Sequence, residues 1–179
     1  MDKIFTKSIV LIGGMAIGKS TTAELLHQKL KMPYFSSDAI RCDVLEKTPD
    51  YSFEKQLEIR KKEGYKGEMK FLNPYSNIAI NNIIDDLKQP SILDIGTFFP
   101  DQLNKELITN LKQFKNIIFL YSNNPYEIIK RRKIDPQSEL GQIYLNTLNS
   151  PIYDQLFTKK INVDKKTPEE IVNEIINSQ

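Results

Sequence analysis

Short apolar runs alternate along the chain with longer segments whose apolar residues recur every three or four positions. Five of the runs fit buried β-strands, at residues 8–12, 33–36, 91–95, 117–121 and 161–163. The longer segments between them fit helices that bury one face. Strands that alternate with helices form parallel sheets covered on both faces. The pattern therefore predicts a three-layer α/β fold around a five-stranded parallel sheet.

A polar and charged stretch at residues 48–71 interrupts this alternation. It contains one exposed helical pattern, which Gly64 and Gly67 are expected to end. Asn73 and Pro74 then fit the start of a new helix, because proline is favoured in a first helical turn. Further on, residues 101–114 and the segment after Pro125 fit amphipathic helices.

One loop carries the most specific motif in the chain. Residues 13–20 match G-x-x-x-x-G-K-[ST], and they lie between a predicted strand and a predicted helix, as a P-loop does. The loop amides can cradle phosphate oxygens, Lys19 can reach the β- and γ-phosphates, and the Ser20 hydroxyl can bind Mg²⁺. The predicted cofactors are ATP and Mg²⁺, and the predicted nucleotide-binding residues of the loop are Gly13, Gly14, Met15, Ala16, Ile17, Gly18, Lys19, Ser20 and Thr21.

Two aspartates occupy positions where open parallel sheets bind ligands, beyond the carboxyl ends of strands. Asp94 lies near the end of the third strand. It could hold Mg²⁺ through water or take the proton of an acceptor hydroxyl, or it could cap the next turn. Asp38 follows the second strand, where it could contact the acceptor or cap the next helix. The residues alone leave both alternatives open.

These features together resemble the shikimate kinase type of small P-loop kinase over nearly the whole chain. Residues 32–38 resemble the family's second strand, 125–132 the helix before its lid, 150–153 the segment after the lid, and 163–172 the C-terminal adenine loop and helix. The resemblance implies one P-loop kinase domain over residues 1–179, with a P-loop NTPase fold. Within it, the lid falls at about 133–149 and the polar insert at about 48–71.

The resemblance also assigns roles to residues outside the P-loop. Arg131 matches an arginine that packs on the adenine, and Thr167 and Pro168 fall in the adenine loop. Asp38 matches a substrate-binding aspartate. Arg132 could lie near the phosphates, although basic residues at a helix C-terminus are also favoured by the helix dipole alone. Lys19, Asp38, Asp94 and Arg132 are the predicted catalytic residues, and Ser20 and Asp94 the predicted metal-binding ones.

Some family positions differ in this chain. Ser36 replaces an aspartate that helps to hold Mg²⁺ through water, and Asn149 replaces an arginine that binds the shikimate carboxylate. A second carboxylate-binding arginine is also missing, since its region offers only Met69 and Lys70. Carboxylates are best bound by arginine forks, so we expect an acceptor less anionic than shikimate.

Composition limits the partners and the cellular compartment that the chain is expected to have. The chain has 179 residues, 40% of them hydrophobic and 27% charged, with a formal net charge of +2. That charge is too small to favour nucleic acid or an acidic membrane as partner. No stretch approaches transmembrane length, and the single cysteine, Cys42, suits a reducing compartment. We expect a cytoplasmic monomer or weak dimer that acts on a small molecule.

Three functions compete at this point. The first is a shikimate kinase-like enzyme that phosphorylates a hydroxyl of a different or uncertain acceptor. The second is a kinase for a nucleoside, a sugar or an antibiotic. The third is a nucleotide-binding switch without transfer activity. The chain lacks the guanine-reading N-K-x-D motif, which argues against this third function.

Overall fold

The computed structural model describes residues 2–96 and 105–178. Five parallel strands form one sheet in the order β2-β3-β1-β4-β5. They are β1 (Ile9–Gly13), β2 (Tyr34–Ser36), β3 (Ile92–Asp94), β4 (Asn116–Tyr121) and β5 (Lys159–Asn162). All five predicted strands are therefore confirmed, although β5 begins two residues earlier than the sequence pattern suggests.

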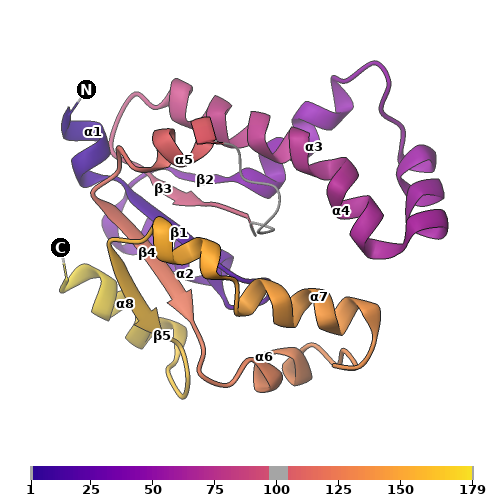
Figure 1. Cartoon of the computed structure of the whole chain (residues 1–179). Helices are drawn as coiled ribbons and strands as arrows, with labels where there is room; N and C mark the ends of the chain where they lie inside the picture. Colours follow the sequence, from indigo (N-terminus) through magenta and orange to yellow (C-terminus); the bar gives the residue numbers. More distant parts are fainter. Residues whose placement is uncertain (1, 97–104, 179) are drawn as a thin grey trace.

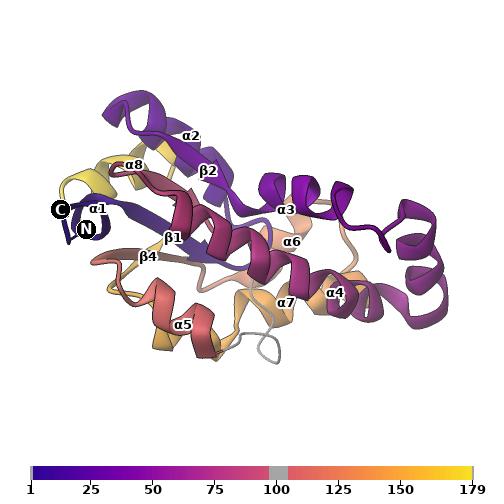
Figure 2. The same cartoon turned by 90° about the horizontal axis from the view of Figure 1, so that it is seen from above.

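Helices cover both faces of the sheet (Figures 1 and 2). Alternate residues of β1 show how the two layers form. Ile9 and Leu11 pack toward α2 and α8, whereas Val10 and Ile12 pack toward α4 and α5. The helices are α1 (Asp2–Lys7), α2 (Lys19–Leu30), α3 (Ser37–Glu46), α4 (Phe53–Asp86), α5 (Lys105–Leu111), α6 (Pro125–Arg131), α7 (Glu139–Leu148) and α8 (Pro168–Ile176), with a 3₁₀ helix at Pro151–Gln155.

The topology places the carboxyl ends of the strands between two groups of helices. In Figure 1, α3 and α4 extend past these ends on one side, and α6 and α7 extend past them on the other. β1 lies in the middle of the sheet, so the loop that follows it lies between the two groups. This arrangement confirms the predicted three-layer P-loop α/β fold.

The polar insert differs from its prediction. Gly64 does interrupt the helix, with φ 69° and ψ −169°, but the second half of α4 continues from there through Gly67 and Pro74 to Asp86. The prediction that a new helix starts at Asn73 is therefore wrong. Burial of Gly67, Glu68 and Leu72 holds this part of the helix in place, and one proline removes only one backbone hydrogen bond.

Two other predictions, the helix at residues 101–114 and the lack of a membrane-spanning stretch, can be compared with the structure only over the described residues. The predicted helix at residues 101–114 is seen as α5 from Lys105, and its first four residues lie outside the described part. Among the described residues, no helix is both long and apolar enough to cross a membrane.

Candidate active site

The P-loop joins β1 directly to α2. Gly18 precedes the helix with φ 101°, a left-handed conformation that favours glycine, and Ala16 also has a positive φ of 62°. Lys19 begins α2, and its Nζ donates to the carbonyl oxygens of Gly13 and Gly14 at 3.0 Å each. The ammonium is thereby held over the loop. Burial lowers the pKa of Lys19, while the nearby carboxylates of Asp94 and Asp38 raise it.

Ser20 and Asp94 come from different elements and meet at the loop. Asp94 is the last residue of β3 and lies opposite Leu11 of β1 in the strand register. Ser20 Oγ donates to Asp94 Oδ2 over 2.6 Å. Asp94 is only 4% exposed, and this burial raises the pKa of its carboxyl group, against the opposing effects of Lys19 and Ser20.

This oxygen pair fits the predicted magnesium. Mg²⁺ prefers oxygen ligands and keeps several of its waters, so one hydroxyl and one carboxylate are a suitable set. The described residues contain no group of three or more histidine, cysteine or acidic side chains that could hold a metal on their own. Ser20 and Asp94 would therefore share the ion with phosphate oxygens and water.

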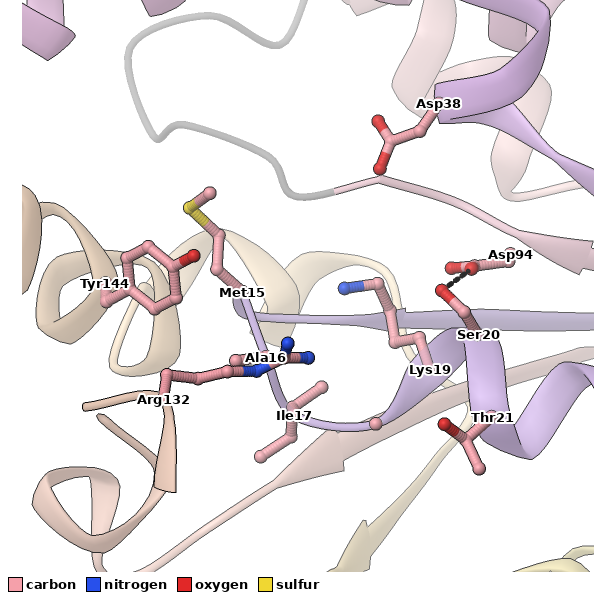
Figure 3. Close-up of a pocket in the computed structure, with 11 residues that line it drawn as sticks. Met15, Ala16, Ile17, Lys19, Ser20, Thr21, Asp38, Asp94, Arg132 and Tyr144 are labelled. Atoms are coloured by element: carbon pink, nitrogen blue, oxygen red, sulfur yellow. Dashed lines mark hydrogen bonds between the residues drawn. The ribbon is translucent and has the colours of Figure 1, made fainter. Parts of the chain in front are cut away.

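One cavity of about 230 Å³ collects the predicted catalytic residues (Figure 3). Residues 15–21 form its P-loop side. Asp38 of α3, Asp94 of β3, Arg132 at the end of α6 and Tyr144 of α7 complete the lining. We call it the P-loop cavity. Four side chains that are far apart in the sequence, Lys19, Asp38, Asp94 and Arg132, thus face the same space.

A second cavity of about 160 Å³ lies on the other side of the loop, next to α6 and α8. Ala16 and Ile17 of the loop line it, together with Thr21, Arg131 and Pro168. The adenine is predicted to lie here, from the resemblance of Arg131 and Pro168 to the family's adenine-binding residues. Thr167 is not among the lining residues of either cavity. Its side chain caps α8 in a capping box, with Glu170 N donating to Thr167 Oγ1 over 3.3 Å.

The described residues bear on the capping alternatives for the two aspartates. The N-cap of α3 is Ser36, whose Oγ accepts from Ala39 N, and Asp38 lies inside the first turn. The capping role for Asp38 was therefore wrong. Asp38 instead forms an ion pair with Arg41 over 3.1 Å. Within the described chain, the hydrogen bonds of the Asp94 carboxylate come from the Ser20 and Tyr34 side chains rather than from a turn.

Helix α7 makes close contact with the P-loop, which the sequence did not indicate. Met15 N donates to Thr147 Oγ1 over 3.3 Å, and Thr147 is fully buried. A Cβ added to Gly14 would lie 2.6 Å from Leu148 Cα, so glycine is needed for the two backbones to come together. At its other end, Glu139 of α7 accepts from Lys66 N beside the kink in α4. Most of the predicted lid is thus a helix that reaches from the P-loop to the insert.

The amino-acid sequence was compared with those of known proteins, and it is similar to shikimate kinases. No protein-family model matches the chain. A shikimate kinase of Enterococcus faecalis (strain ATCC 700802 / V583) is 29% identical over 180 residues, which cover 95% of this chain and 96% of that protein. The chain is a shikimate kinase-like small-molecule kinase. The resemblance stated from the sequence is thereby confirmed.

Solved structures show the same fold. The shikimate kinase of Acinetobacter baumannii in complex with shikimate has a TM-score of 0.68 at 21% identity, and the match covers 98% of this chain and 93% of that one. A gluconokinase of Sinorhizobium meliloti 1021 has a TM-score of 0.59 at 19% identity, with 97% and 91% covered. Kinases named for different acceptors therefore share the fold of this shikimate kinase-like chain.

Proposed function

We propose that this chain transfers the γ-phosphate of ATP, with Mg²⁺, to a hydroxyl group of a small molecule less anionic than shikimate. The observation that carries the proposal is the P-loop cavity, in which two cations, the Ser20–Asp94 pair and Asp38 line one space. Phosphoryl transfer depends mainly on in-line positioning and on neutralising charge. The residues of this cavity can do both.

The nucleotide end of the site follows from the P-loop. Backbone amides of residues 15–20 and the N-terminus of α2 would bind the phosphates, and Lys19 would neutralise their charge. Arg132 lines the same cavity and would add a second cation at the γ-phosphate. Arg131 and Pro168 line the cavity next to α6 and α8, where the adenine would lie.

Ser20 and Asp94 would hold the magnesium. The ion would supply positive charge that neutralises the phosphates. Asp94 must be ionised for this role, although its burial favours the neutral form. Its contact with Ser20 and the nearby Lys19 ammonium both stabilise the charged carboxylate.

Asp38 would serve the acceptor. Its side chain is 62% exposed and lines the P-loop cavity from the α3 side. In the transfer step, the acceptor oxygen forms a bond to the γ-phosphorus, the bond from phosphorus to the β–γ bridging oxygen breaks, and ADP leaves. Asp38 takes the proton of the acceptor hydroxyl.

The acceptor itself is inferred from the two family arginines that this chain lacks. Asn149 is the exposed C-cap residue of α7, and Lys70 is exposed on α4. A hydrogen bond to a charged group contributes roughly 1.5–3 kcal/mol, so losing two would weaken binding of a carboxylate by about two to four powers of ten. Lys70 could supply one charge, but it lacks the fork geometry of arginine.

A coupled ADP-release assay tests the proposal. With ATP, Mg²⁺ and a panel of hydroxylated metabolites, we expect steady acceptor-dependent ADP formation, and little or none with millimolar shikimate. Ordinary turnover of shikimate with a KM of a hundred micromolar or below would show that other residues replace the arginines. A nucleoside, a sugar or an antibiotic as the best acceptor would agree with the proposal and would identify the class of acceptor. Slow hydrolysis alone would favour a switch.

A further inference from the structure

Arg41 occupies a fixed place between α3 and α4, one helical turn beyond Asp38. Its Nη1 forms an ion pair with Asp38 Oδ1 and donates a hydrogen bond to Ser76 Oγ on α4, each over 3.1 Å. Ser76 Oγ in turn donates to the carbonyl oxygen of Leu72 over 3.3 Å. The Arg41 side chain is only 26% exposed. The guanidinium is therefore held next to the carboxylate that lines the P-loop cavity.

The chain just after β3 lies close to Asp38. Gly96 N donates to Ser37 Oγ over 2.6 Å, and a Cβ added to Gly96 would lie 2.9 Å from Asp38 Oδ1. One carboxylate oxygen, Oδ1, is thus paired with Arg41 and lies close to Gly96. The other oxygen, Oδ2, has no hydrogen-bond partner within the described ranges 2–96 and 105–178, so it can accept from a ligand.

The charges of the cavity are distributed unevenly. Figure 3 shows Lys19 and Arg132 beside the P-loop, where the phosphates are proposed to bind, and Asp38 on the opposite side. On that side, the charge of Arg41 is already compensated by Asp38. A carboxylate that approached Arg41 would also meet the negative charge of Asp38, which disfavours it. A hydroxyl group meets no such conflict, because it can donate to Asp38 Oδ2 and accept from an Arg41 N–H.

We propose that Arg41 and Asp38 together select an uncharged, hydroxyl-rich acceptor. Arg41 holds Asp38 in position and donates to an acceptor hydroxyl, so it determines specificity without acting on the phosphate. The inference rests on the proposed function and names the chemical class of its acceptor. The sequence signal for it is small, an arginine three residues after Asp38 on the same helical face.

The test compares neutral acceptors with matched acids. ADP release is measured with alditols and free sugars, with the aldonic acid of each carbon skeleton, and with shikimate. The variants are R41Q, R41K and the control K47Q, which removes an exposed cation at the end of α3. For the neutral acceptor that the wild type uses, R41Q should raise the acceptor KM about tenfold or more. The KM for ATP should stay unchanged, R41K should recover part of the loss, and K47Q should behave like the wild type.

Thermal melts establish that each variant is folded. An R41Q variant that is folded and keeps the wild-type acceptor KM contradicts the inference, and so does one that loses only ATP affinity. A wild type that prefers the acids, with R41Q removing that preference, would make Arg41 a carboxylate anchor and would also overturn it. If the wild type phosphorylates no acceptor of either class, the proposed function itself fails, and this inference with it.

Discussion

Ser20 Oγ donates a 2.6 Å hydrogen bond to Asp94 Oδ2, which joins the first turn of α2 to the last residue of β3. These are the two oxygen atoms that we propose as ligands for magnesium. The contact also ties the phosphate-binding loop to the neighbouring strand, so the geometry of the loop depends on the sheet behind it.

Replacing Asp94 with asparagine should therefore impair the chemical step. The amide keeps the shape of the side chain and removes its charge, so kcat should fall by about a hundredfold or more, with a much smaller change in the KM for ATP. D85N, at an exposed position of α4, is the matched control. If D94N keeps its kcat and only melts at a lower temperature, Asp94 has a structural role.

The same variant should be more stable than the wild type at neutral pH. Burial raises the pKa of Asp94 above its ordinary value of 3.8, even with Lys19 and Ser20 opposing the shift. A carboxyl whose pKa is raised by folding contributes stability that is full below the unfolded pKa and is lost as the pH rises through the folded pKa. D94N cannot ionise and escapes this loss. Melting temperatures should show D94N above the wild type at about pH 7.5 and close to it at about pH 4; a lower melting temperature at neutral pH would contradict this.

Gly14 should tolerate no side chain while α7 stays in place. A Cβ at this position would lie 2.6 Å from Leu148 Cα and 2.8 Å from Leu148 N, and backbone atoms cannot turn away as a side chain can. G14A should lower the free energy of unfolding by about 1–3 kcal/mol and raise the KM for ATP, because the loop or the helix must shift. Urea unfolding and steady-state kinetics measure the two effects. Wild-type values for both would mean that α7 is not held against the loop.

The kink in α4 should depend on one ion pair. Glu68 is fully buried and accepts from Arg60 through both oxygens, with Arg60 Nη2 to Oε1 at 2.7 Å. R60M would leave the carboxylate with Gln56 as its remaining hydrogen-bond donor among the described residues. We expect a loss of about 3 kcal/mol in the free energy of unfolding, at the low end for a buried pair because the Arg60 side chain is 40% exposed. The matched control is K61M, at the exposed next position; equal stabilities of R60M and K61M would contradict the role of the pair.

Much of the fold could be predicted because it depends on local patterns. The alternation of Ile9, Val10, Leu11 and Ile12 between two helical layers follows from a buried strand, and the P-loop motif fixes what comes after it. The course of α4 could not be predicted in the same way. The buried Glu68 pairs with Arg60 across the Gly64 kink, and no local pattern indicates such a contact.

In the candidate site, too, local sequence patterns predict some residues, whereas others depend on contacts far apart in the sequence. The P-loop residues and the two aspartates could be found from the motif and from strand ends. The sequence offered Asp38 as a possible N-cap, however, and only the three-dimensional structure assigns that role to Ser36. Arg41 and Tyr144 belong to no motif. They come close to the site because α3 and α7 pack beside it, which depends on contacts far apart in the sequence.

Acceptor-dependent ADP release by the wild type and by K19A is the most direct test of kinase activity at the P-loop. Lys19 Nζ lies over the P-loop, where it would neutralise the phosphates during transfer. We expect steady ADP formation by the wild type that requires both Mg²⁺ and a hydroxylated acceptor. A folded K19A variant should be slower by about a hundredfold to a thousandfold. Wild-type turnover by K19A, or ADP formation by the wild type that no acceptor increases, would contradict the assignment of this chain as a small-molecule kinase.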